Sequence, residues 1–281
     1  MRIRHMTFSD IEFALACTHE EGWRSETSET FKNFLQYDAE GCFIAEEDHQ
    51  AIGLCVGTHY GNWGFLGELI VIKEKRGLGI GRSLLNHTIV YLKDRGSETV
   101  VLDADLLAVP LYENVGFQKI CRSFRFIGRN EGNRSPHVRV MQADDLDQVK
   151  NLDKIAFGAD RSFFLKRIFN LHPEYAKVLV SDGEISGFIL AQKGYQVISV
   201  GPWIALDSTE HPEMLFENLA AEVKDSDIRI GVLENNPRAV SMMKAMPFMM
   251  NQEYCWRMVL GGSDSTGRPD QVFAIGSGAK G

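Results

Sequence analysis

Three glycines alternate with other residues in the segment Arg76-Gly77-Leu78-Gly79-Ile80-Gly81-Arg82-Ser83. Glycines at every second position let the backbone approach a ligand without obstruction by side chains. Two flanking arginines add positive charge, so phosphate is the ligand that this composition favours. Two common phosphate motifs do not match, because a dinucleotide fingerprint requires glycine at position 82 and a Walker loop requires lysine there. The segment therefore indicates an anion site of another kind.

The flanking elements place this segment at a strand-to-helix turn. Leu69-Ile70-Val71-Ile72 is a short apolar run, typical of a buried strand. Along residues 80–92, apolar side chains recur at three- and four-residue spacing, which predicts an amphipathic helix that ends near Gly96. Unpaired backbone N–H groups and the helix dipole attract phosphate at such a turn.

The segment resembles the R/Q-x-x-G-x-G/A signature of the GCN5-related N-acetyltransferase (GNAT) superfamily. A second stretch, running from Leu102-Asp103-Ala104 to Tyr112 and Gly116-Phe117, is similar to the superfamily's L-Y-x-x-x-G-F segment. The resemblance covers Met1 to about Phe126 and implies that acetyl-coenzyme A is the acyl donor. The residues that it assigns to the coenzyme are Leu69, Ile70, Val71, Arg76, Gly77, Leu78, Gly79, Ile80, Gly81, Arg82 and Ser83.

The chemistry that the resemblance implies is acyl transfer from a thioester to an amine. A neutral amine must attack, the developing oxyanion needs a hydrogen-bond donor, and the leaving thiolate benefits from a proton. Tyr112 matches the tyrosine that often acts as general acid in this superfamily, and the amides of Ile70 and Val71 are candidates to polarise the acetyl carbonyl. Two candidates for the general base stay open: Glu68, which can equally be a solvated strand end, and Asp103 at the end of the next strand.

The pattern of the first half recurs in the second. Arg4 followed by Asp10 is echoed by Arg139 followed by Asp145, an offset of 135 residues, and Phe117 is echoed by Phe248 at an offset of 131. Such a nearly constant offset indicates internal duplication, with two unrelated domains of similar rhythm as the alternative. The glycine turn has no second copy, because the acidic stretch 207–212 stands in its place and is a poor phosphate cradle.

We therefore predict an α+β fold of two tandem acetyltransferase-like domains, each a twisted mixed sheet flanked by helices. The predicted boundaries are 1–127 for a catalytic domain, 128–136 for a linker, 137–261 for a degenerate domain without cofactor, and 262–281 for a Gly-rich C-terminal tail that is frayed at its end. The apolar run 272–275 within this tail is expected to add an edge strand to one of the domains.

Composition excludes several classes of protein. An apolar fraction of 44% is typical of a globular chain, and a net charge of −8 argues against nucleic-acid binding. No apolar run is long enough to span a membrane and no signal-peptide core is found, so a cytoplasmic location is expected. The five scattered cysteines contain no C-x-x-C pair, which favours reduced thiols and no metal site.

The sequence thus predicts an N-acetyltransferase that moves an acetyl group from acetyl-coenzyme A to an amine by direct attack in a ternary complex. The expected acceptor is a small molecule, and the chain is expected to be a monomer or a homodimer. Two alternatives stay open: a protein lysine or N-terminus as the acceptor, or a non-catalytic sensor of acyl-coenzyme A.

Overall fold

The computed structural model describes residues 1–250, 254–262 and 267–281, which divide into two compact units. The described residues of unit 1 are 1–120, 257–262 and 278–280, and those of unit 2 are 121–250, 254–256, 267–277 and 281. Each unit is a mixed sheet flanked by helices, so the predicted α+β class is confirmed.

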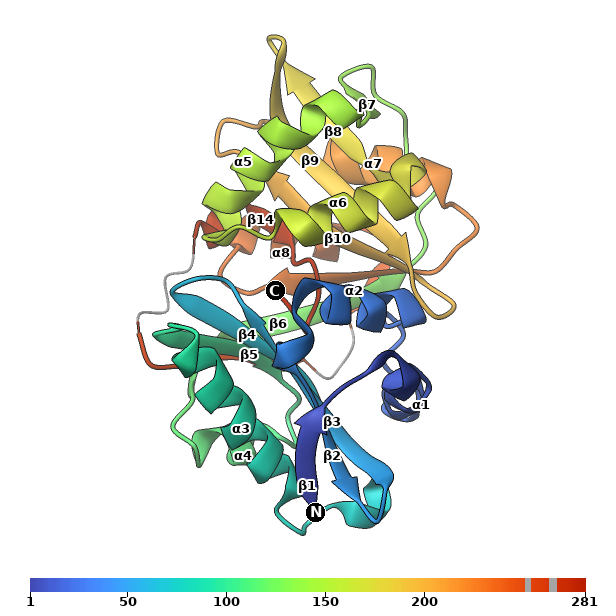
Figure 1. Ribbon diagram of the computed structural model, residues 1–281. Helices are drawn as coiled ribbons and strands as arrows, with labels where there is room; N and C mark the ends of the chain where they lie inside the picture. The colour runs from blue at the N-terminus through green and yellow to red at the C-terminus, as the bar shows by residue number, and fades with distance from the viewer. Residues whose placement is uncertain (251–253, 263–266) are drawn as a thin grey trace. The chain divides into compact units, whose positions relative to one another are not determined.

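Unit 1 carries the glycine turn. In chain order its elements are β1 (Arg2–His5), α1 (Ile11–Glu20), α2 (Ser28–Asp38), β2 (Cys42–Glu47), β3 (Gln50–His59), β4 (Trp63–Val71), α3 (Ile80–Asp94), β5 (Thr99–Ala104), α4 (Val109–Glu113) and β13 (Cys255–Leu260). The strand order is β1-β2-β3-β4-β5-β13, with antiparallel pairs from β1 to β4 and a parallel pair of β4 with β5. α3 and α4 lie on one side of this sheet, and α1 and α2 lie on the other (Figure 1).

The helix predicted after the glycine turn is α3, and its apolar stripe faces the sheet. The residues that recur at helical spacing are buried, namely Ile80, Leu84, Leu85, Thr88 and Leu92. The contacts are close, because a Cβ placed at Gly57 on β3 would lie 2.8 Å from the Thr88 methyl group. Packing of this stripe fixes where the helix begins, and therefore where the glycine turn lies.

Unit 2 repeats this plan. In chain order its elements are β6 (Gln118–Gly128), β7 (Val138–Val140), α5 (Leu146–Phe157), α6 (Ser162–Leu171), β8 (Lys177–Ser181), β9 (Glu184–Lys193), β10 (Ile198–Ala205), α7 (Glu213–Glu222), β11 (Ile228–Leu233), α8 (Pro237–Ala245), β12 (Phe248–Met250) and β14 (Val272–Ala274). The strand order is β6-β11-β10-β9-β8-β7, and β10 and β11 run parallel as β4 and β5 do. Trp203 on β10 lies at the centre of the core, stacked on Phe216 of α7 with ring centroids 5.7 Å apart.

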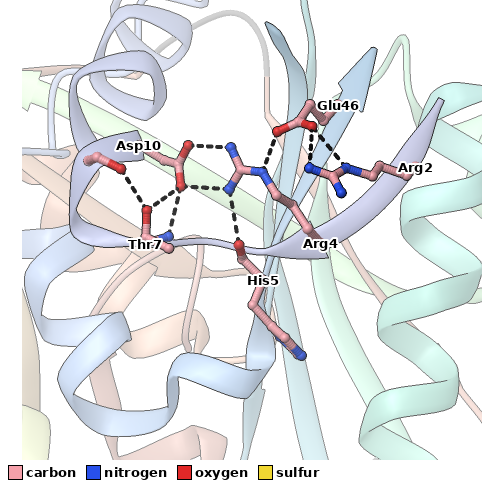
Figure 2. A network of polar contacts seen from close by, with 7 residues as sticks. Arg2, Arg4, His5, Thr7, Asp10 and Glu46 are labelled. Carbon is pink, nitrogen blue, oxygen red and sulfur yellow. Dashed lines mark hydrogen bonds and ion pairs between the residues drawn. The ribbon is translucent and has the colours of Figure 1, made fainter. Parts of the chain in front are cut away.

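The strands β1 and β7 carry the same arginine–aspartate clip. Arg4 donates through Nη1 and Nη2 to the two carboxylate oxygens of Asp10 at 2.8 and 2.7 Å, and through Nε to Glu46 at 2.6 Å (Figure 2). Arg139 donates to both oxygens of Asp145 at 2.6 and 2.9 Å. In each unit the aspartate also accepts a hydrogen bond from the backbone N–H three residues before it. The two clips lie at the offset of 135 residues seen in the sequence, which supports internal duplication.

We expect Asp10→Asn to lower the free energy of unfolding by about 1–2 kcal/mol at pH 7, because hydrogen bonds to charged groups contribute about 1.5–3 kcal/mol and partial exposure weakens them. The Arg4 guanidinium lowers the pKa of Asp10 to about 2. A depressed pKa stabilises the folded chain above the ordinary pKa of aspartate, and this stabilisation is lost as the pH falls towards 2. Urea denaturation at several pH values should therefore show the difference between variant and wild type shrinking below pH 4.

The matched control is Asp145→Asn in the second clip. The Arg139 side chain is 46% exposed, whereas that of Arg4 is 28% exposed, so solvent weakens the second clip more. The expected loss of stability is accordingly smaller. Equal losses in the two variants, or a difference from wild type that is as large at pH 2 as at pH 7, would contradict this account of the clip.

The two compact units are not the contiguous segments predicted from the sequence. Most of β6 falls within the predicted first domain 1–127, but β6 pairs with β11 at six positions from Ser123 to Gly128, and its residues from Cys121 onward belong to unit 2. The predicted linker 128–136 is packed in unit 2 as well, where a Cβ at Gly132 would come within 2.1 Å of the Glu217 carbonyl oxygen. These residues belong to unit 2 because they contact elements that are distant in the sequence, and their position along the chain does not reveal this.

The segment predicted as a Gly-rich tail is also built into the units, apart from residues 263–266, which lie outside the described part. The apolar run 272–275 contributes β14, which pairs antiparallel with β10. The prediction of a frayed end is wrong, because Ala279 and Lys280 are 6% and 5% exposed.

Candidate functional site

The glycine turn has an open, left-handed backbone. Gly77 and Gly79 have φ angles of +77° and +81°, and a Cβ added at either would meet nothing within 4 Å. Glycine adopts these angles without strain, whereas other residues rarely do. Gly81 lies in the first turn of α3, where a Cβ would make ordinary contacts at 3.7 and 3.8 Å. The first two glycines are therefore required by conformation and leave free space above the turn.

The N-terminus of α3 presents backbone N–H groups at this turn. Gly79 is the residue before the helix, and the N–H of Ser83 donates to its carbonyl oxygen at 3.0 Å. The N–H groups of Ile80, Gly81 and Arg82 come before any intrahelical acceptor. Arg82 is exposed on the same first turn. The three free amides, the dipole of a 15-residue helix and the charge of Arg82 all favour a negatively charged group at this turn. A pyrophosphate is such a group.

Arg76 contacts the protein itself in this structure. Its Nε donates to the Val71 carbonyl oxygen at 2.8 Å, and its Nη2 pairs with the carboxylate of Glu21. These contacts close the turn onto the end of β4. The predicted role of Arg76 in neutralising phosphate is therefore better met by Arg82.

Strand β4, which leads towards the turn, carries a bulge at Glu68. In its register with β3, Gly67 faces Val56 and Ile70 faces Leu54, so β4 has one residue more than its partner. Glu68 has a φ of +53°, which is uncommon for a residue with a side chain. Bulges re-aim side chains and are frequent beside active sites. The side chain of Glu68 is only 2% exposed, so the solvated strand end considered from the sequence is wrong.

The environment of Glu68 disfavours its charged form. Neither of its carboxylate oxygens has a hydrogen-bond partner in the described part of the protein. Burial raises its pKa well above that of an ordinary glutamate; the nearby Glu26 raises it further, while Lys280 lowers it. A carboxylate whose pKa is raised holds a proton more tightly than an ordinary glutamate, which is the property that a general base needs.

The two parallel strands β4 and β5 pair over only part of their length. Their register runs from Trp63 and Thr99 to Phe65 and Val101, although β4 continues to Val71 and β5 to Ala104. This leaves backbone groups near the carboxyl ends of both strands available to a ligand, at the edge of the sheet where α/β proteins bind ligands.

The pairing of β4 with β3 shows which of these amides are available. The N–H of Ile72 donates to the Ile52 carbonyl oxygen at 3.0 Å. Since hydrogen-bond direction alternates along a regular antiparallel strand, the N–H of Ile70 also faces β3, and that of Val71 faces away from it. Of the predicted pair Ile70 and Val71, only Val71 therefore points its amide to the side of β5.

The other predicted catalytic residues lie in different surroundings. Asp103 on β5 accepts a hydrogen bond from Arg257 Nε at 2.5 Å, and its side chain is 1% exposed. The Asp103 carboxylate is already engaged by Arg257, whereas neither oxygen of Glu68 has a partner among the described residues, so Glu68 is the better placed of the two candidates. Tyr112 on α4 is 6% exposed and packs edge-to-face on Phe117, with ring centroids 5.9 Å apart.

Sequence reasoning missed three residues that the fold brings to the site, Glu26, Arg257 and Lys280. Arg257 and Lys280 are distant in the chain from the residues they contact, and Lys280 lies in the segment predicted as frayed. Within the described ranges, no cluster of three or more histidine, cysteine, aspartate or glutamate side chains is arranged to hold a metal ion.

Comparison with known families agrees with this architecture. A family model described as "Acetyltransferase (GNAT) family" matches residues 8–117, and one described as "Acetyltransferase (GNAT) domain" matches residues 149–274. The chain belongs to the GNAT superfamily. It is a tandem member, and the donor used by this superfamily is acetyl-coenzyme A.

Individual relatives of this GNAT protein include enzymes and structures from several organisms. It is 25% identical over 250 residues to "Uncharacterized N-acetyltransferase YitH" of Bacillus subtilis, which covers 83% of each chain. It is 35% identical over 104 residues to N-alpha-acetyltransferase 30 of Dictyostelium discoideum, covering 34% of this chain and 56% of that one. A putative acetyltransferase from Pyrococcus horikoshii shares the fold, with a TM-score of 0.83 and 24% identity over 100% of this chain and 95% of that chain.

None of the helices in the described part of this GNAT protein combines the length and apolar character needed to cross a membrane.

Proposed function

We propose that unit 1 is an acetyl-coenzyme A-dependent N-acetyltransferase that acts by direct attack of an amine in a ternary complex. The observation that carries the proposal is the Glu68 carboxyl group, which is buried at a bulge of the strand that leads towards the glycine turn, with neither oxygen hydrogen-bonded among the described residues. A sensor that only binds acyl-coenzyme A has no use for a buried, unpartnered base, and burying one without a role is costly.

The residues of unit 1 divide the work as follows. Amides at the start of α3, with Arg82, hold the pyrophosphate, and the amide of Val71 holds and polarises the acyl arm. Acetyl-coenzyme A supplies the acetyl group as a reactive thioester. Glu68 takes a proton from the acceptor amine, and Tyr112 gives a proton to the leaving sulfur.

Unit 2 has lost the features that suit it to a coenzyme. Where unit 1 has its glycine turn, Arg238 donates to the carbonyl oxygens of Thr209 and Glu210 at 2.6 and 2.9 Å. β14 pairs with β10, and the N–H of Ile275 donates to the Gly231 carbonyl oxygen on β11 at 3.0 Å. The chain itself thus fills the space between the two parallel strands, so we propose one coenzyme site per chain, in unit 1.

A protein lysine or N-terminus is the second candidate acceptor. The 35% identity with N-alpha-acetyltransferase 30 over 104 residues favours it, although that match covers about half of the relative's length. A small amine remains the first candidate, because the match to that relative covers only 34% of this chain.

We expect Gly79→Glu to weaken binding of acetyl-coenzyme A about 100-fold, because placing a negative charge against the pyrophosphate costs several kcal/mol. Isothermal titration calorimetry measures the effect directly. Gly96→Glu is the matched control, since Gly96 follows the other end of α3, has a φ of +96°, and also has open space around its Cβ position. It imposes the same kind of backbone strain and the same charge far from the turn. Equal affinities in the two variants would show that the pyrophosphate binds elsewhere.

A further inference from the structure

Residues 278–280 belong to unit 1 and lie against β4. A Cβ placed at Gly67 would come within 2.2 Å of the Ala279 carbonyl oxygen, so the two backbones are in direct contact. Tyr60 donates through its hydroxyl to the Lys280 carbonyl oxygen at 2.9 Å. Gly67 is the residue before Glu68, so this segment is fixed beside the bulge that carries the candidate base.

The side chain of Lys280 is buried. Its residue is 5% exposed, and Nζ lies 5.2 Å from the ring centroid of Phe34 on α2. The negative face of an aromatic ring attracts a cation, and a lysine is almost never buried to this extent without such compensation. The fold therefore contains a ready-made environment for an alkylammonium group.

Two buried carboxyl groups complete this environment. Glu68 and Glu26 are 2% and 5% exposed. Glu26 accepts a hydrogen bond of 2.7 Å from the Ser25 hydroxyl, whereas both oxygens of Glu68 have no partner among the described residues. Lys280 is close enough that its charge lowers the pKa of Glu68, against the upward effects of burial and of Glu26. Lys280 and Glu26 thus both interact electrostatically with the buried carboxyl group of Glu68.

We propose that this recess, formed by Phe34, Tyr60, Glu26 and Glu68, is the acceptor subsite of the enzyme, and that Lys280 occupies it as an internal stand-in for the acceptor. The proposal rests on the proposed function and names the acceptor class. The acceptor is a primary amine at the end of an unbranched alkyl arm, as in a diamine or a lysine side chain. Such an ammonium group meets the same aromatic ring and is attracted by the same buried carboxyl groups.

Transfer from this recess balances without a further reagent. The ammonium group gives one proton to Glu68 and becomes a neutral amine. Its lone pair forms the C–N bond, the C–S bond of the thioester breaks, and the electrons of that bond leave on sulfur. Tyr112 gives its proton to sulfur and takes up the second proton lost by nitrogen, and Glu68 releases the first proton to solvent, so the products are an amide and a free thiol.

The test uses the full chain with Lys280→Ala and n-butylamine, which reproduces the arm and the ammonium group that the variant lacks. If Lys280 occupies the recess for about nine-tenths of the time, it lowers the apparent affinity of the wild type for n-butylamine about tenfold. We therefore expect the variant to bind n-butylamine about tenfold more tightly than the wild type. Thiol release from acetyl-coenzyme A at subsaturating n-butylamine should rise by the same factor. n-Butanol, which has the arm without the charge, should not bind.

Lys177→Ala is the matched control, because Lys177 is a second lysine buried to 4% exposure, 3.4 Å from Glu222 in unit 2. Its removal opens a comparable hole but should not change thiol release. If Lys280→Ala binds acetyl-coenzyme A normally and gains nothing with n-butylamine, the recess is not the acceptor subsite, and the proposed function still stands. If neither the wild type nor the variant binds acetyl-coenzyme A, the proposed function itself fails.

A second measurement needs no variant. In the wild type, KM for thiol release should fall along the series from methylamine to n-butylamine, and alaninamide, whose amine is on a branched carbon, should be a poorer acceptor than either. Comparison of 1,5-diaminopentane with a lysine-containing peptide then distinguishes a free small molecule from a protein as the source of the amine. A preference for alaninamide would overturn the proposal, because an amine of that kind cannot extend into the recess.

Discussion

Glu68→Gln should lower kcat about 10³-fold while leaving the affinity for acetyl-coenzyme A unchanged, since removal of a general base costs about 10²- to 10⁴-fold. The wild-type rate should rise with pH as Glu68 loses its proton, and burial moves this rise well above the ordinary range for a glutamate. The variant should lose the rise. A pH profile of kcat/KM, measured by thiol release, shows both effects.

Stability provides an independent check on the same residue. A carboxyl group whose pKa is raised in the folded state favours folding at low pH, and this contribution is lost as the pH rises through the folded-state pKa. Glutamine carries no such charge, so Glu68→Gln should be more stable than the wild type at alkaline pH, and its lost activity cannot then be attributed to misfolding. A variant less stable than the wild type at every pH would contradict the view that Glu68 is a strained, functional group.

Two neighbouring substitutions separate Glu68 from the other candidate base. Glu26 raises the pKa of Glu68, so Glu26→Gln should shift the rise in rate to lower pH without abolishing it. Asp103→Asn should leave the position of the rise unchanged and reduce stability, because it removes the ionic partner of Arg257. If the rise disappeared in Asp103→Asn and persisted in Glu68→Gln, the two assignments would have to be exchanged.

The parts of this site that could be predicted are those set by local sequence. Glycines at positions 77 and 79 and the periodic apolar residues from Ile80 onward specify a turn and a helix within one continuous segment, and the structure has both. The duplication was also visible, because the Arg4–Asp10 and Arg139–Asp145 clips are each formed within seven consecutive residues. Local propensity and spacing suffice where the interacting groups are neighbours in the chain.

The rest depends on contacts that sequence spacing does not encode. Lys280 lies 220 residues from Tyr60, which binds its carbonyl group, and Arg257 lies 154 residues from Asp103. The glycines around residues 276–281 are typical of a frayed end, but Gly67 offers a surface without a side chain on which this segment packs. The bulge at Glu68 has no signature of its own, since Gly64-Phe65-Leu66-Gly67-Glu68 continues into an ordinary apolar strand. Its positive φ results from the mismatch in register with β3.

Tyr112→Phe should lower kcat about 10²-fold, at the lower end of the range for a general acid, because a thiolate is already a good leaving group. The wild-type rate should fall at high pH as the phenol loses its proton, and this fall should be absent in the variant. Phenylalanine keeps the edge-to-face contact with Phe117, so the fold is retained. The control is Phe117→Leu, which disturbs the packing of Tyr112 and leaves its hydroxyl in place; it should lower stability and preserve the fall at high pH. If Tyr112→Phe retained both the full rate and the fall at high pH, the proton delivered to sulfur would come from another group, and α4 would serve only to close the core against β5.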